Sequence, residues 1–173
     1  MFRSSLIAFL TLCSVPSSAQ QLSADLSEFQ QILGTWSCSG QNSGTPQSPA
    51  FEFESQFRIE ATLGGSFVQV SYSETESSVL PIARDNIEYW QGANGAFTST
   101  FFNSFGQKGE LTSEGIFAGI LVWRGIINTP NGPAPFEGRI EQRQPDQLSV
   151  EPTLLLPDGS EFVIARLNCR KSD

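Results

Sequence analysis

About ten short segments with the patterning of β-strands follow one another at close spacing through most of the chain. The clearest runs from Phe51 to Glu60, where four apolar residues, including Phe53 and Phe57, alternate with polar ones. Period-2 alternation of this kind predicts a strand with one buried face and one face in solvent. We expect further strands over residues 34–40, 66–73, 87–91, 96–103, 110–117, 119–127, 136–143, 148–155 and 160–169.

Turn-forming residues separate these segments. Ala93-Asn94-Gly95, between two strand-like runs, is a strong hairpin signal. Residues 128–135, with the sequence NTPNGPAP, are expected to form only a turn or loop, because proline and glycine interrupt regular strands. Before the strands, residues 22–33 predict one short helix with an apolar face. The residues of that face are Leu22, Leu26, Phe29 and Leu33.

Many short strands with short connections predict an antiparallel sandwich or a barrel. Two features favour the barrel: nearly every connection is short enough for a meander, and a bond between Cys38 and Cys169 would put the first strand beside the last. An even number of strands also lets an antiparallel meander close. We therefore expect an all-β protein, a closed antiparallel up-and-down barrel of about ten strands with one short N-terminal helix. No shift in composition divides the chain, so a single domain is expected over residues 20–173.

The first 19 residues have the pattern of a cleaved secretory signal peptide. Residues 6–12 form a short apolar run, and Ser17-Ser18-Ala19 supplies the small residues for cleavage after Ala19. The run is well short of the roughly 20 residues that a membrane span requires, so we expect no membrane span. A lipoprotein signal at Cys13 is disfavoured because the preceding Leu12 is large. The expected location is periplasmic or extracellular.

Cleavage would leave two cysteines, Cys38 in the first expected strand and Cys169 in the last. Export places them in an oxidising compartment, where two cysteines of one chain should pair. The alternative is two separate buried thiols. A Cys38–Cys169 disulfide would hold the first strand beside the last, as closure of a barrel requires.

The charge and the missing residue types exclude several functions. The chain has no histidine, and its 10 basic and 18 acidic residues give a net charge of −8. Without histidine there is no Ser-His-Asp or Cys-His catalysis, and we expect no metal and no cofactor. Nucleic acid is an unfavourable partner because an acidic surface repels phosphate. Glu88, beside Trp90, and the pair Glu110 and Glu114 could bind a cation or a polar ligand group if their side chains point inward.

Aromatic residues are the more informative group, at 11% of the chain. A barrel of about ten strands is wide enough to hold a small ligand rather than only packed side chains. The alternative is that the aromatic residues fill a dry core. The residues that we expect to line a ligand cavity are Phe53, Phe57, Trp90, Phe97, Phe101 and Trp123.

Three stretches carry a family resemblance: LGTWSCSG at 33–40, LGGSF at 63–67 and YWQGANGAFTSTFFNSFG at 89–106. In this order and spacing they resemble a lipocalin-like family of secreted bacterial proteins of unknown function in the calycin superfamily, distantly similar to the nitrobindins. The resemblance spans the first half of the chain after the signal peptide, and the second half matches only in strand rhythm. It implies a barrel with one closed end.

The resemblance also implies roles for particular residues. In that superfamily a tryptophan of the first strand closes one barrel end, often beneath an arginine from the last strand. Trp36 matches the tryptophan, and Arg166 or Arg170 would stack on its indole; the alternative is that Trp36 is an ordinary core residue. Nitrobindin-like proteins bind haem through a histidine. This chain has none, so histidine-ligated haem is excluded.

Three functions compete. The first, which we favour, is an exported binding protein that holds a small apolar or amphipathic ligand in a cavity of roughly several hundred cubic ångströms. The second is a cell-envelope interaction or structural module, with a filled barrel, an apolar outer patch and an envelope protein partner. The third is an enzyme that works from carboxylates and Arg124 or Arg139 inside the barrel; enzymatic activity is the less favoured expectation.

Overall fold

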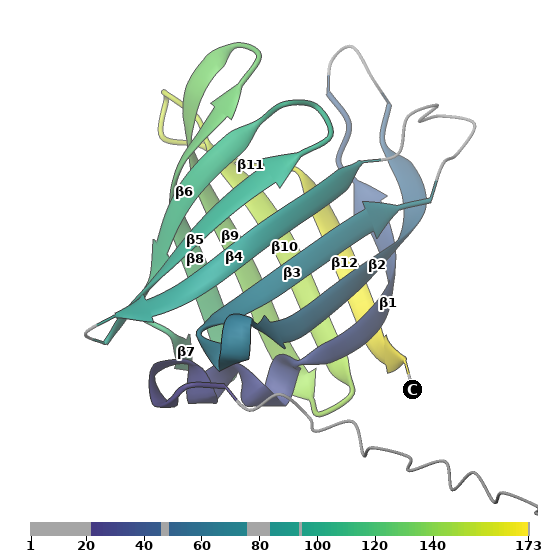
Figure 1. Cartoon of the computed structure of the whole chain (residues 1–173). Coiled ribbons are helices and arrows are strands. Elements are labelled where there is room, and N and C mark those ends of the chain that lie inside the picture. The colour runs from purple at the N-terminus through teal and green to yellow at the C-terminus, as the bar shows by residue number, and fades with distance from the viewer. Residues whose placement is uncertain (1–21, 46–48, 76–83, 94, 173) are drawn as a thin grey trace, which may run out of the picture.

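The computed structural model describes residues 22–45, 49–75, 84–93 and 95–172, and the expected signal peptide with Cys13 lies outside this part of the chain. Within these residues lie two short 3-10 helices, η1 (Ala24–Ile32) and η2 (Leu63–Gly65), and no helix long and apolar enough to cross a membrane. The strands, shown in Figure 1, are β1 (Gly34–Asn42), β2 (Phe51–Thr62), β3 (Phe67–Glu74), β4 (Asp85–Ala93), β5 (Ala96–Asn103), β6 (Lys108–Ser113), β7 (Ile116–Phe117), β8 (Ile120–Thr129), β9 (Gly132–Gln144), β10 (Gln147–Leu155), β11 (Glu161–Val163) and β12 (Ala165–Ser172).

Ten of these strands close into one antiparallel barrel. Each strand from β1 to β6 pairs with the next, β6 pairs with β8, and the series continues through β9 and β10 to β12, which pairs with β1. The short strands β7 and β11 are additions to β8 and β10. The predicted closed up-and-down barrel with one short N-terminal helix is confirmed.

The first and last strands of the barrel are also joined covalently. Cys38 of β1 lies opposite Cys169 of β12 in the strand register, and their sulfur atoms form a disulfide. Both side chains point into the barrel and are buried. The predicted disulfide is therefore confirmed, and it lies at the seam where the barrel closes.

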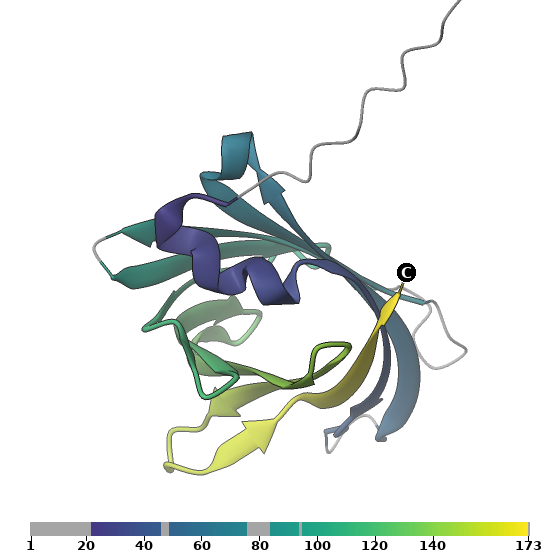
Figure 2. The same cartoon turned by 90° about the horizontal axis from the view of Figure 1, so that it is seen from below.

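The helix η1 lies across one end of the barrel, as Figure 2 shows from below. Its buried side chains, Leu26, Phe29 and Ile32, recur every three residues, as the three residues per turn of a 3-10 helix require. The Phe29 ring lies 5.2 Å from the Trp90 ring and 4.9 Å from the Phe97 ring. The helix is shorter than the expected 22–33, and Ile32 rather than Leu33 is its last buried residue.

The expected loop over 128–135 is wrong. Strand β8 continues to Thr129 and β9 begins at Gly132, so that Pro133 and Pro135 lie within a strand. Both prolines pair only with β8, because the pairing of β10 with β9 begins at Phe136. On such a free edge the missing proline N–H breaks no ladder hydrogen bond, so the strand tolerates it.

Inward-facing aromatic rings lie opposite glycines of the neighbouring strands. A β-carbon added at Gly40 would come within 2.5 Å of the Phe53 ring, so this ring occupies the space that a side chain would otherwise fill. The rings therefore pack against the barrel wall. Such cross-strand pairs are Gly40 with Phe53, Gly92 with Phe97, and Gly109 with Phe101. Gly138 lies opposite Trp123 in the register, but the ring nearest to it is that of Phe136.

Candidate functional site

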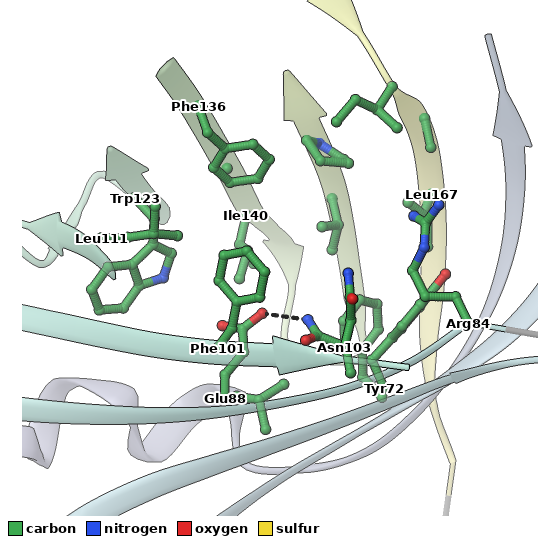
Figure 3. Close-up of a pocket in the computed structure, with 18 of the residues that line it drawn as sticks. Tyr72, Arg84, Glu88, Phe101, Asn103, Leu111, Trp123, Phe136, Ile140 and Leu167 are labelled. Carbon is green, nitrogen blue, oxygen red and sulfur yellow. Dashed lines mark hydrogen bonds between the residues drawn. The ribbon is translucent and has the colours of Figure 1, made fainter. Parts of the chain in front are cut away.

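A cavity of about 180 Å³ lies inside the barrel, from its middle toward the end opposite η1 (Figure 3). This is smaller than the several hundred cubic ångströms that we expected, and below the roughly 300–1,000 Å³ of pockets for drug-sized ligands. It is close to an engineered protein cavity of about 150 Å³ that accepts benzene. The space therefore suits a molecule built on about one ring.

Five of the six residues expected to line the cavity do so. They are Phe53, Phe57, Trp90, Phe101 and Trp123, and other apolar wall residues include Leu111, Phe136, Ile140, Leu148, Val150 and Leu167. Phe97 is buried but lies outside the cavity, against Phe29. It shares the inward face of β5 with Phe101, but the two lie four positions apart, which is about 13 Å along a strand, and Phe97 is at the helix-covered end.

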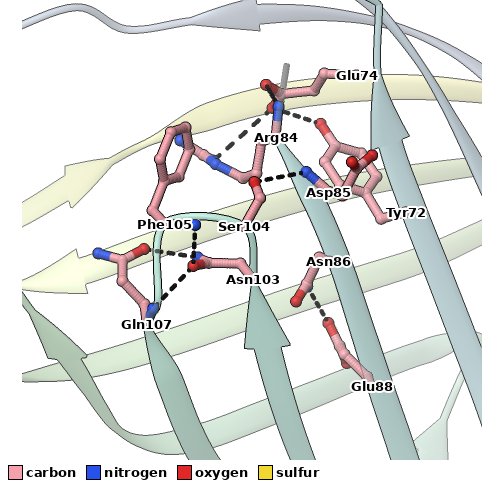
Figure 4. Close-up of polar contacts among 10 residues, drawn as sticks. All are labelled: Tyr72, Glu74, Arg84, Asp85, Asn86, Glu88, Asn103, Ser104, Phe105 and Gln107. Carbon is pink, nitrogen blue, oxygen red and sulfur yellow. Dashed lines mark hydrogen bonds and ion pairs between the residues drawn. The ribbon is translucent and has the colours of Figure 1, made fainter. Parts of the chain in front are cut away.

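The end of the cavity opposite η1 is polar (Figure 4). Tyr72 Oη donates a hydrogen bond to Glu74 Oε1 at 2.8 Å. The backbone amide of Arg84 donates a hydrogen bond to Glu74 Oε2 at 3.3 Å. The guanidinium of Arg84 forms an ion pair with the same carboxylate, with Nη1 3.8 Å from Oε1. Burial, followed by the negative charge of Glu74, raises the pKa of Tyr72, so the phenol keeps its proton. Asn103 Nδ2 donates to Gln107 Oε1 at 2.7 Å on the same rim.

Glu88 lies deeper, on the inward face of β4. Its Oε2 accepts hydrogen bonds from Trp90 Nε1 at 3.0 Å and from Ser99 Oγ at 3.3 Å, and its Oε1 accepts one from Asn86 Nδ2 at 3.0 Å. Burial raises the pKa of Glu88 despite these three donors. The part of the side chain that remains accessible faces the cavity.

Three residues that line the cavity each hold one buried polar atom without a hydrogen-bond partner among the described residues: Arg84 Nε, Asn86 Oδ1 and Trp123 Nε1. Leaving a buried donor or acceptor unpaired costs about 1–3 kcal/mol. Each of these atoms has less than 1 Å² of accessible surface, so a ligand reaches one only after the side chain turns. The polar side chains at one end and the aromatic wall together suit an amphipathic molecule.

Sequence reasoning identified the aromatic wall but missed most of the polar one. Asn86, Glu88 and Trp90 alternate along β4, so an inward Trp90 places all three inside; this signal was available for Asn86. Arg84 and Gln107 lie just outside the ends of strands. Period-2 patterning does not predict the orientation of such residues.

The expected arginine over Trp36 is wrong. Trp36 is fully buried at the helix-covered end, and Lys171 Nζ lies 5.3 Å from the centroid of its ring. Lys171 stands opposite Trp36 in the register of β1 and β12, on the inward side of the strand. Arg166 has the opposite parity, points outward and pairs with Glu151 at 2.9 Å.

The residues expected for an enzyme do not gather in the cavity. Arg124 is exposed and pairs with Glu137 on the outer surface at 2.8 Å. Arg139 alternates with inward-facing Gly138 and Ile140, so it also points outward. In the part of the chain that the structure describes, no three potential metal ligands of the Cys, Asp and Glu types come together.

No protein-family model matches the sequence, and no curated protein matches it. Among solved structures, Rv2717c from M. tuberculosis superposes with a TM-score of 0.69 and 13% identity, over 88% of this chain and 100% of that chain. The S-type phycobiliprotein lyase CPES from Guillardia theta gives a TM-score of 0.43 and 10% identity, over 84% of this chain and 90% of that chain. A de novo designed fluorescence-activating β-barrel gives a TM-score of 0.45 and 13% identity, over 87% of this chain and 100% of that chain. The likeness to Rv2717c is one of fold.

Proposed function

We propose that this chain is an exported β-barrel binding protein that holds one small amphipathic molecule in the barrel cavity. The observation that carries the proposal is an aromatic-walled cavity of about 180 Å³ that is lined at one end by polar side chains, with the Glu88 carboxylate deeper inside. Burial of apolar surface would supply the affinity, and the polar atoms would fix the orientation. The small volume limits the ligand to about one ring with short substituents.

Export and family membership belong to the same proposal. Residues 1–19 would be removed as a signal peptide, and residues 20–173 would fold as one lipocalin-like domain of the calycin superfamily. The Cys38–Cys169 disulfide supports a periplasmic or extracellular location, because disulfides persist in oxidising compartments. The Gly34-Thr35-Trp36 segment at the closed end supports the lipocalin-like relationship.

An envelope interaction role is the second candidate. Phe102 on β5 and Ile126 on β8 are about half exposed, at 48% and 51%, on the outer face of the barrel. An interaction role predicts a filled barrel, however, and this barrel contains a cavity, which supports the binding role instead. A carboxylate enzyme has less support, because Arg124 and Arg139 point away from the cavity.

Native mass spectrometry of the full chain, expressed with its own N-terminus in a bacterium and purified from the periplasm without detergent, tests the proposal. We expect a mass that corresponds to cleavage after Ala19, a gain of about 2 Da on reduction of the disulfide, and an adduct that leaves on denaturation. A chain that stays bare after incubation with a lipid and pigment extract would contradict the binding role.

A cavity-filling variant separates binding in the cavity from binding elsewhere. Val150 lies on the inward face of β10 and lines the cavity. We expect Val150→Phe to abolish retention of the adduct while costing about 1–3 kcal/mol of stability through overpacking. Ile126→Phe adds a ring on the outer face and is the matched control. Equal adduct retention by both variants would place the ligand outside the barrel.

A further inference from the structure

The charges on the cavity lining are not balanced. Four titratable side chains line it in the described part of the chain: Tyr72, Glu74, Arg84 and Glu88. Arg84 and Tyr72 both contact Glu74, so its charge is compensated at the rim. Glu88 is paired with no cation among the described residues. The facing strands β8, β9, β10 and β12 contribute no titratable side chain to the lining.

Glu88 is also not the only acceptor at this depth. Asn86 lies two residues away on the same face of β4, and its Nδ2 is used on Glu88, which leaves the buried Oδ1 without a partner. A donor group in the cavity meets the Glu88 carboxylate first, and it reaches the amide oxygen only if the Asn86 side chain turns. A positively charged N–H donor matches a carboxylate better than a hydroxyl does.

The walls around Glu88 are suited to a cation as well. Phe101 lies directly opposite Glu88 in the register of β4 and β5, and the rings of Trp90 and Trp123 lie 5.2 Å apart on the same lining. The faces of aromatic rings attract ammonium groups, most strongly when water is excluded. The net charge of −8 draws cations toward the protein from a distance.

Metal ions and anions fit the site less well. Magnesium and calcium prefer six or more oxygen ligands, and one carboxylate with one amide oxygen among aromatic rings does not provide them. An anion would need a free cationic group, and Arg84 is engaged with Glu74. A carboxylate ligand beside Glu88 would add repulsion between like charges.

Resting on the binding function above, we propose that the ligand is a small organic cation, an ammonium group on an apolar body of about one ring. The Glu88 carboxylate accepts hydrogen bonds from the ammonium, and the aromatic wall holds the ring.

Three probes of nearly equal shape test this inference: 2-phenylethylamine, 2-phenylethanol and 3-phenylpropionate. Their affinities for the full chain are measured by titration calorimetry at neutral pH. We expect the amine to bind at least about tenfold more tightly than the alcohol, because hydrogen bonds to charged groups are the stronger ones, and the carboxylate to bind weakest. Glu88→Gln should bring the ratio of amine to alcohol affinity close to one. Glu110→Gln, an exposed site on β6, is the control and should leave the ratio unchanged.

Proton release provides a measurement that needs no variant. Burial raises the pKa of Glu88, and an ammonium bound beside the carboxylate lowers it again, so binding of the amine is coupled to release of a proton from this group. The amine affinity should therefore rise with pH, and the apparent enthalpy should depend on the ionisation enthalpy of the buffer.

The outcomes distinguish the inference from the function on which it rests. An alcohol that binds as tightly as the amine, or a carboxylate that binds most tightly, overturns the cation preference while the barrel remains a binding protein. Failure of all three probes to bind, together with a bare chain in native mass spectrometry, overturns both.

Discussion

At the scale of single residues, Glu88 couples the interior of the barrel to pH. Its carboxyl group has an ordinary pKa of 4.5, and burial raises the pKa in the folded protein. Above about pH 4.5 the folded chain therefore binds more protons at this site than the unfolded chain does. Stability from this group is fully present below the unfolded pKa and is lost as pH rises through the folded pKa.

The corresponding prediction concerns the free energy of unfolding. In the ligand-free protein, titration of Glu88 should make the free energy of unfolding fall as pH rises above about 4.5, by at most about 1.4 kcal/mol per pH unit. Glu88→Gln should remove this component, since the amide does not titrate and can still accept from Trp90 and donate to Asn86 once the Asn86 amide turns over. Urea unfolding of both proteins between about pH 4.5 and 8 measures it. A stability difference that does not change with pH would contradict the raised pKa.

Residue identities explain both the success and the failure at the closed end of the barrel. Trp36 was placed correctly because alternation along Gly34–Gly40 puts it on the face of Cys38. The cation that stacks on Trp36 was predicted wrongly. The resemblance implies an arginine of the last strand, but the strand register determines which residue lies opposite Trp36. That residue is Lys171, and Arg166 is five positions away with the other parity.

At the scale of elements, the strands fit together through pairs of an aromatic residue and a glycine. Gly109 on β6 lies opposite Phe101 on β5, and a β-carbon there would clash with the ring and approach Ile127. Glycine inside a strand usually marks such a close approach. The sequence does not predict these pairs, because it does not show which residue lies across the strand from a glycine.

The pairing predicts a non-additive response to mutation. Gly109→Ala should cost about 1–3 kcal/mol, because the Phe101 ring must leave its position against the wall. In the background of Phe101→Leu the same substitution should cost clearly less, since the smaller side chain leaves room for the added methyl group. Urea unfolding of the four proteins of this double-mutant cycle measures the coupling. Equal costs in the two backgrounds would show that the ring does not depend on the glycine.

The strands themselves were largely predictable, and their exceptions have physical causes. Period-2 patterning located most strand centres, including the predicted 96–103, which matches β5. It failed at Pro133 and Pro135, where only the pairing of the whole sheet shows that β9 has a free edge. The polar rim of the cavity was not predicted for a related reason. Arg84 and Gln107 lie beyond the ends of strands, where no repeating pattern indicates which way a side chain points.

At the scale of the whole molecule, the disulfide fixes the ends of the meander to each other. Cys38 and Cys169 are 131 residues apart in the sequence, so the bond restricts nearly the entire unfolded barrel chain. In the chain-entropy model a loop of this length corresponds to an upper value of about 5 kcal/mol. The folded seam also has its own ladder, which runs from Thr35 opposite Ser172 to Asn42 opposite Ala165.

Reduction should therefore lower stability without opening the barrel. We expect the double variant Cys38→Ala and Cys169→Ala to lose up to about 5 kcal/mol of unfolding free energy in urea, while its far-ultraviolet circular dichroism at zero denaturant keeps the β signature, because the β1–β12 ladder remains. The oxidised and reduced forms of the unmutated chain provide the comparison. A loss below about 1 kcal/mol would mean that the ladder alone determines closure, and would remove the stability argument for an oxidising compartment. A loss near the upper value would make export a condition of the stable fold, since the disulfide persists only where thiols are not kept reduced.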